Sequence, residues 1–97
     1  MKVKINYDYN QQELLGKKTE EVEIADNTTL EEFLTQIDDK IIEIGKKKNR
    51  DISSLCMLNN GELSCIVAVN KTPPENVLKY KLRNWDEIDI VFGFCGG

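Results

Sequence analysis

The sequence predicts an α+β fold in which a mixed sheet packs on one main helix, and two patterns carry the prediction. Near both ends of the chain, apolar residues alternate with polar ones, which is typical of half-buried strands. Between them, one long segment repeats its apolar residues at helical spacing. Because the helix has one apolar stripe and the sheet has one apolar face to cover it, the two are expected to share a core.

Two strands are predicted in the first quarter of the chain. Apolar and polar residues alternate from Val3 to Tyr7 and again from Glu21 to Ile24, where the outward side chains are acidic. The segment between them, NQQELLGKK, is polar and is expected to be a turn region. The two strands therefore form a hairpin.

One helix is predicted over NTTLEEFLTQIDDKIIEIGKKK. Its apolar stripe consists of Leu30, Phe33, Leu34, Ile37, Ile41 and Ile44. Thr28 or Thr29, each with a glutamate three residues later, offers a capping box, and Gly45 suits the far end. The run Lys46-Lys47-Lys48 has two interpretations, a docking patch or cations that stabilise the helix dipole, and the second needs no partner.

The second half of the chain predicts a hairpin, a short element and a last strand. Asn59-Asn60-Gly61 separates two apolar runs and carries a strong hairpin signal. The second run, Leu63 to Val69, is apolar on both faces and is expected to be a central strand. After two prolines, a short element is expected at Val77 to Leu82, and the turn RNWDE then leads to an alternating strand from Ile88 to Phe94.

This order of elements is that of the β-grasp arrangement. No internal repeat, linker or boundary interrupts it, so residues 1–97 are expected to form a single domain. The end of the chain, from about residue 93 to 97, is expected to be a flexible Gly-Gly tail.

Composition excludes several classes of function. The net charge of −4 disfavours phosphate-mediated binding of nucleic acid. No apolar run approaches the roughly 20 residues of a membrane span, and MKVKINYDYN offers no signal peptide, so a cytoplasmic protein without a membrane partner is expected. Three cysteines, an odd number without a Cys-x-x-Cys spacing, are expected to be thiols. The absence of histidine disfavours a self-sufficient hydrolase and a His-ligated metal.

The chain resembles the ubiquitin-like sulfur carriers, the family of the molybdopterin synthase small subunit and the thiamine-biosynthesis sulfur carrier. The likeness is carried by TTLEEFL at the start of the helix, the strand IVAVN, the stretch LRNWDEIDI before the last strand, and Gly96-Gly97 at the end. It spans most of the chain except roughly Lys46 to Glu62, which looks like an insertion relative to the shortest members.

Two departures from the family pattern leave the pathway open. Trp85 stands where the family turn commonly has glycine, and because a bulky residue tolerates a positive φ poorly, the turn is expected to differ or to shift register. The residues before the diglycine, Phe92-Gly93-Phe94-Cys95, differ from the proline-containing run of the molybdopterin branch.

The resemblance implies a reactive carboxylate at Gly97. In this family an adenylating, E1-like partner uses ATP to activate the terminal carboxylate, and sulfur then replaces the adenylate to give a thiocarboxylate for a sulfur-accepting synthase subunit. The carrier binds no cofactor of its own and is a carrier or small subunit, not a complete enzyme. Two glycines suit this chemistry because a chain without Cβ atoms threads a narrow channel, and an extended tail from Gly93 reaches about 17 Å.

The neighbours of the diglycine have assigned roles and alternatives. Phe92 is expected to be core and Phe94 a docking contact, since aromatic residues are favoured at interface centres. Cys95 lies beside the reactive terminus and is placed with the tail. A direct chemical role for its thiol is the alternative, but no histidine or lysine neighbours it in the sequence to lower its pKa. Cys65, within an apolar strand, is expected to be a buried small hydrophobe.

Three questions stay open at this point. The same adenylation chemistry would serve a ubiquitin-like modifier conjugated through Gly97, and a β-grasp binding module with an inert tail is a further alternative. Asp86, Glu87 and Asp89 form either a solvated face or a patch that steers the domain toward a basic enzyme surface.

Overall fold

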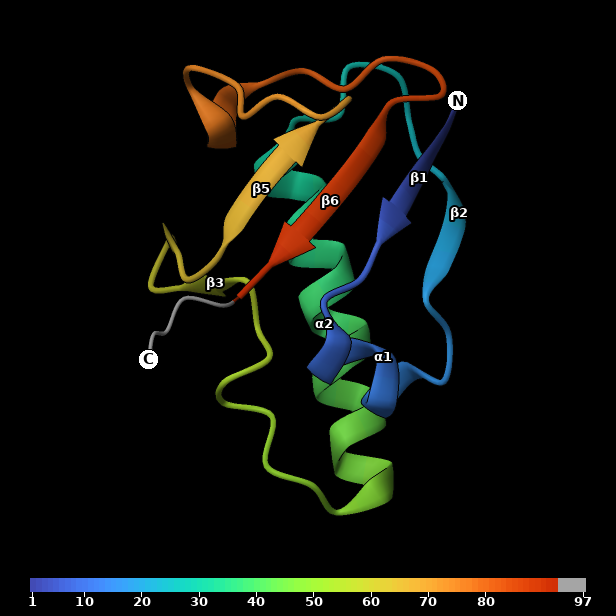
Figure 1. Ribbon diagram of the computed structural model, residues 1–97, viewed down its shortest axis with the longest axis vertical. Helices are drawn as coiled ribbons and strands as arrows, with labels where there is room; N and C mark the ends of the chain where they lie inside the picture. Colours follow the sequence, from blue (N-terminus) through green and yellow to red (C-terminus); the bar gives the residue numbers. More distant parts are fainter. Residues whose placement is uncertain (93–97) are drawn as a thin grey trace.

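The computed structural model describes residues 1–92 and arranges them as a sheet with one long helix across its inner face (Figure 1). The elements in chain order are β1 (Lys2–Asn6), α1 (Tyr9–Leu15), β2 (Thr19–Glu23), α2 (Leu30–Lys48), β3 (Leu58–Asn59), β4 (Glu62–Leu63), β5 (Ile66–Val69), the 3-10 helix η1 (Val77–Lys79) and β6 (Glu87–Val91). Within residues 1–92, no helix is long and apolar enough to cross a membrane.

The main sheet is mixed, with the strand order β2-β1-β6-β5 (Figure 1). β1 pairs antiparallel with β2 and parallel with β6, whereas β5 and β6 are antiparallel. The first and last strands of the chain are therefore neighbours at the centre of the sheet. Together with α2 across one face, this is the predicted α+β arrangement.

α2 confirms the predicted helix and its capping box. The side chain of Thr29 accepts a hydrogen bond from the backbone of Glu32, whose side chain in turn accepts one from the backbone of Thr29. The prediction that Gly45 ends the helix was wrong, because the helix continues to Lys48 and ends at Asn49, which adopts a left-handed φ of 54°. Gly45 is instead a buried interior position where Ile52 packs directly on the helix.

The core fills the space between α2 and the inner face of the sheet. The α2 side chains Leu30, Phe33, Leu34, Ile37 and Ile41 are all at most 1 % exposed, and Val3, Ile5, Val67, Ile88 and Ile90 face them from the strands. Phe33 is the largest of the fully buried side chains. The apolar side chains predicted from the helical spacing and those predicted from the strand alternation therefore face each other in one apolar layer.

The segment between β1 and β2 is a helix, so the predicted polar turn region was wrong. α1 begins at the N-cap Asp8, whose side chain accepts from the Asn10 backbone while the Gln11 side chain accepts from the Asp8 backbone. It ends at Gly16, which has a left-handed φ of 75°. Leu14 is fully buried and Leu15 packs partly buried against the core, so the short helix has an apolar face that contacts α2.

The predicted hairpin at Asn59-Asn60-Gly61 is confirmed, but its second apolar run is not a central strand. Asn60 and Gly61 both have positive φ, as a two-residue hairpin turn requires. The run divides into β4 and β5, and β5 lies at the edge of the main sheet. Ile66 points to the outer face of the sheet, which α2 does not cover, and is 54 % exposed.

The turn before β6 holds Trp85 in a left-handed conformation with φ of 68°. The expectation that a bulky residue would force a different turn was therefore wrong. The Trp85 backbone N–H donates to the Lys2 carbonyl, and Asn84 Oδ1 accepts from the Lys2 backbone N–H. These two hydrogen bonds to Lys2, which is distant in the sequence, hold the turn in a left-handed backbone conformation that is energetically unfavourable for a residue other than glycine.

Candidate functional site

The candidate site is the point at which the chain leaves the sheet after β6. The predicted site residues Phe94, Cys95, Gly96 and Gly97 lie outside the described residues. The described residues closest to them in the chain are Val91 and Phe92, which we call the tail root. β6 lies between β1 and β5 in the sheet, so its position is fixed from both sides (Figure 1).

Phe92 is half-buried and packs against the core, in line with its predicted role. Its backbone N–H donates to Asp8 Oδ1 at 3.0 Å across a sequence separation of 84 residues. Asp8 Oδ2 accepts from the backbone N–H of Asn10 at 3.2 Å. One carboxylate therefore caps α1 and holds the tail root at the same time.

An apolar corner lies beside the tail root on the outer face of the sheet. Ile66 and Val91 are directly paired across β5 and β6, and Ala68 follows on the same face of β5. Ile66 is 54 % exposed and Val91 is 48 % exposed. We call these three residues the apolar corner. They form an exposed apolar surface next to Phe92, the last described residue, on which a partner protein could pack.

The acidic residues of β6 differ in their surroundings. Glu87 and Asp89 lie on the outer face, where both accept hydrogen bonds from Asn6 Nδ2. Asp89 also pairs with Lys71 at 3.6 Å. Asp89 lies opposite Ala68 of the apolar corner, and Glu87 lies two residues away from Asp89 on the same face of β6.

Asp86 belongs neither to a solvated face nor to a steering patch, because its side chain is only 5 % exposed. Its carboxylate accepts hydrogen bonds from Asn70 Nδ2, the Tyr80 hydroxyl and the Arg83 backbone N–H at 2.9 to 3.1 Å. Burial and the hydrogen bond from the Tyr80 hydroxyl to the Asp86 carboxylate raise the pKa of Tyr80. Asp86 is therefore a structural residue of the turn before β6.

The two described cysteines, Cys56 and Cys65, are free and half-buried. Burial, reinforced by the nearby carboxylates of Asp38 and Asp8, raises the pKa of Cys65 to about 12. Burial and the charges of Asp38 and Asp39 likewise raise the pKa of Cys56. A protonated thiol is a poor nucleophile. The half-buried Cys65 fits the predicted packing role.

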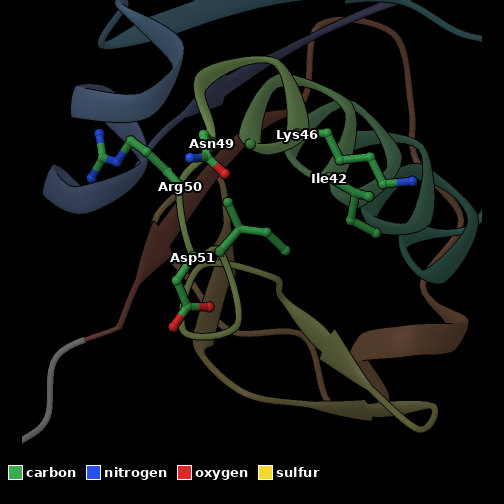
Figure 2. A pocket seen from close by; sticks show the side chains of 7 residues that line it. Ile42, Lys46, Asn49, Arg50 and Asp51 are labelled. Carbon is green, nitrogen blue, oxygen red and sulfur yellow. The ribbon is translucent and has the colours of Figure 1, made fainter.

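A separate hollow of about 400 Å³ lies at the C-terminal end of α2 (Figure 2). It is lined by Ile42, Gly45, Lys46, Asn49, Arg50, Asp51 and Ile52. Lys46 and Arg50 extend to opposite sides of it (Figure 2). No residue of the tail root lines it, so the hollow is not part of the candidate site.

The lysine run at the end of α2 is occupied in part by contacts within the chain. Lys47 Nζ pairs with Glu43 at 3.4 Å, and Lys48 Nζ donates to the Leu14 carbonyl at 2.7 Å. All three lysines also lie in the last turn of the helix, where cations stabilise the dipole. These contacts favour the structural interpretation for two of the three lysines.

Sequence reasoning missed four residues of the site, namely Asp8 and the three residues of the apolar corner, Ile66, Ala68 and Val91. A signal for Asp8 was present, because Asp8 and Gln11 have the spacing of a capping box and Gly16 follows at helix length. For the apolar corner no local signal existed, since its exposure depends on which face of the sheet α2 leaves uncovered. Among residues 1–92, no three His, Cys, Asp or Glu side chains converge as metal ligands would.

No family model matches the sequence, and no curated protein matches it significantly. Solved structures do match. The HVO 2177 protein of Haloferax volcanii superimposes with a TM-score of 0.75 at 15 % identity, covering 100 % of this chain and 87 % of its own. SAMP1 (small archaeal modifier protein 1) of the same organism gives 0.71 at 16 % identity, covering 100 % of both chains.

A third similar structure is a Pyrococcus furiosus protein described as molybdopterin converting factor, subunit 1. It gives a TM-score of 0.60 at 17 % identity and covers 94 % of this chain and 95 % of its own. These identities are too low to carry function across, but the superpositions span essentially the whole chain. The protein therefore has the ubiquitin-like β-grasp fold.

Proposed function

We propose that this protein is a sulfur carrier whose Gly97 carboxylate is activated by a partner enzyme. The observation that carries the proposal is the position of β6, the central strand that leads from the middle of a β-grasp sheet to Gly96-Gly97 within six residues of Val91. An apolar corner lies beside this exit. A partner that docks on the corner would receive the tail at its own active site.

The proposed reaction has two steps. A carboxylate oxygen of Gly97 attacks the α-phosphorus of ATP, which forms an acyl adenylate and releases pyrophosphate. A sulfide equivalent then attacks the carbonyl carbon, AMP leaves, and the terminus becomes a thiocarboxylate. The first step is needed because a carboxylate is a poor acyl electrophile without a good leaving group. The chain itself supplies a substrate terminus and a docking surface, while the partner supplies ATP binding and catalysis.

The residues of the described part suit a substrate protein. The Cys56 and Cys65 thiols are kept protonated by burial, so neither competes for the activated carbonyl. The apolar corner and the neighbouring carboxylates of Glu87 and Asp89 would meet a partner surface with an apolar centre and basic surroundings. A sulfur-accepting synthase subunit would use the same exit.

A second candidate is a ubiquitin-like modifier, favoured by the likeness to a structure named small archaeal modifier protein 1. In this reaction a lysine amine of a target protein attacks the activated carbonyl of Gly97 and displaces the leaving group, forming an amide. Both candidates share the adenylation step and differ only in the nucleophile. A β-grasp module with an inert tail would undergo neither reaction.

The mass of the intact protein, purified from its native cell, distinguishes a sulfur carrier, a protein modifier and a module with an inert tail. Peptide mapping then shows whether the modification lies on Gly97. Exchange of oxygen for sulfur adds about 16 Da, as does oxidation of a cysteine or methionine, so the shift must lie on the peptide that ends in Gly97. A conjugate adds the mass of a target. An unmodified Gly97 under conditions of active sulfur transfer would contradict the proposal.

The docking part of the proposal is tested with charge substitutions. Ile66→Asp and Val91→Asp should each raise the KM for the carrier in ATP–pyrophosphate exchange by about tenfold or more, because a buried unpaired carboxylate at an interface centre is costly. Ile42→Asp, on the exposed side of α2, is the matched control. Equal KM values for all three variants would exclude the corner as the docking site.

A further inference from the structure

The final backbone N–H of the described chain has an unusual partner. The last register pair between β6 and β5 is Val91 with Ile66, and the last between β6 and β1 is Asp89 with Asn6. Phe92 therefore lies one residue beyond the last pair with β5 and three residues beyond the last pair with β1. Its N–H is paired with the side chain of Asp8 and not with a strand.

Asp8 occupies the place where the ladder would continue. In the parallel pairing of β1 and β6, Asn6 lies opposite Asp89, so residue 8 falls opposite Val91. β1 has ended by then, and the chain turns into α1 with Asp8 as its N-cap. The Asp8 carboxylate thus replaces the missing carbonyl acceptor at 3.0 Å and extends the hold of the sheet on β6 by one residue.

Asp8 is itself held in place by three further hydrogen bonds. Its Oδ2 accepts from Asn10 N–H, its carbonyl accepts from Gln12 N–H at 2.9 Å, and its N–H donates to Gln11 Oε1 at 3.2 Å. Gln11 is fully buried, and its Nε2 donates to the Leu55 carbonyl at 3.0 Å. A series of bonds therefore runs from the segment after α2, through Gln11 and Asp8, to the tail root.

We infer that Asp8 is a positioning residue that sets the direction in which the tail leaves the sheet, and that Gln11 orients it. This inference rests on the proposed function, because a direction matters only where a partner receives the tail. A reacting terminus displaced by about 1 Å can lose roughly a hundredfold in rate. Fixing Phe92 narrows the set of directions available to the five residues that follow it.

The test uses Asp8→Ser in the full-length chain. Serine is also a good N-cap, so α1 keeps its capping hydrogen bond. The single, shorter side-chain oxygen of serine cannot also accept the hydrogen bond from the Phe92 N–H. Asp38→Ser is the matched control, because Asp38 likewise accepts from two backbone N–H groups, those of Met57 and Leu58, but makes no bond to β6. Asp8→Asn, which keeps the volume and one acceptor oxygen, should give an intermediate result.

Two measurements are made on these variants. Amide hydrogen exchange of Phe92 should accelerate by about tenfold or more in Asp8→Ser, since a charged acceptor is lost, while Ile88 exchange stays unchanged. In ATP–pyrophosphate exchange with the adenylating enzyme of the same organism, kcat should fall about tenfold and KM for the carrier should stay within about twofold, because the apolar corner is intact. Asp38→Ser should change neither quantity per folded molecule.

The outcomes separate this inference from the function on which it rests. Unchanged Phe92 exchange in Asp8→Ser would overturn the inference without any partner enzyme. Faster Phe92 exchange with an unaltered kcat would overturn it as well, because the bond would then be structural only. A wild-type protein that supports no ATP–pyrophosphate exchange would contradict the proposed function, and the Phe92 measurement would still decide whether Asp8 holds the tail root.

Discussion

The interior between α2 and the sheet and the tail root are held by different kinds of contact. The interior is apolar and continuous, with Phe33 and its neighbours on α2 excluded from water. The tail root has a half-buried Phe92 and one hydrogen bond to the side chain of Asp8. The contrast assigns stability to the first region and the direction of the tail to the second, so each should be changeable without the other.

Truncation of Phe33 should have the largest effect on the interior. Phe33→Ala removes a fully buried ring and should lower the free energy of unfolding by about 3–5 kcal/mol. Ile42→Ala, at a partly exposed position of the same helix, should cost clearly less. Chemical denaturation measures both. A Phe33→Ala variant as stable as the parent would mean that α2 does not pack as described.

Gly45→Ala tests the packing of the segment that follows α2. In an exposed helix this change stabilises by about 1 kcal/mol, but here a Cβ would lie 2.4 Å from Ile52 Cγ2. Overpacking costs about 1–3 kcal/mol, so a net loss of about 1 kcal/mol is expected. In the double variant with Ile52→Ala the effect should reverse sign relative to Ile52→Ala alone. An additive result in this cycle would show that the two residues do not clash.

Asp38 should give a smaller, pH-dependent effect. Burial raises its pKa above the ordinary 3.8, against the hydrogen bonds from Met57 and Leu58. The folded protein then holds this proton more tightly than the unfolded chain, so the associated stability is present below pH 3.8 and is lost as pH rises through the raised pKa. The unfolding free energy of the parent minus that of Asp38→Asn should therefore decrease as the pH rises from 3.8 through the raised pKa of Asp38. Asp39→Asn controls for the loss of one charge, and a rising difference would contradict the assignment.

Deletion of Gly96 and Gly97 should have the smallest effect on stability. Phe92 is the last described residue that packs against the core, and glycine contributes no apolar side-chain area. The melting temperature is expected to change by less than about 2 °C, while activation is abolished. A larger drop, measured by calorimetry, would place the tail in the stabilising region and remove the contrast between the two.

The sequence predicted those features that are set by neighbouring residues. The α2 capping box at Thr29 and the Asn60-Gly61 turn are local patterns, and both were found as expected. Features set by distant pairing were not predictable. Whether β5 is central or at the edge depends on β6, which lies some twenty residues later, and the burial of Asp86 depends on Asn70 and Tyr80.

The candidate site divides in the same way. The diglycine motif and the core role of Phe92 could be proposed from the sequence, since each follows from residue type and strand periodicity. The partner of Phe92 could not, because the Asp8 bond spans 84 residues. Trp85 was misjudged because the bonds of Lys2 to the turn outweigh its local preference.

The adjacency of β1 and β6 has a consequence for folding during synthesis. The sheet cannot close until β6 has left the ribosome, because within residues 1–92 β6 alone joins β1 to β5. Contacts of such large sequence separation form late and slow the folding of a small domain. The tail root then comes into being only when the first and last parts of the chain have met. An unfolded chain, or one that lacks either strand, has no Asp8–Phe92 hydrogen bond, so this contact forms only after the two strands have paired.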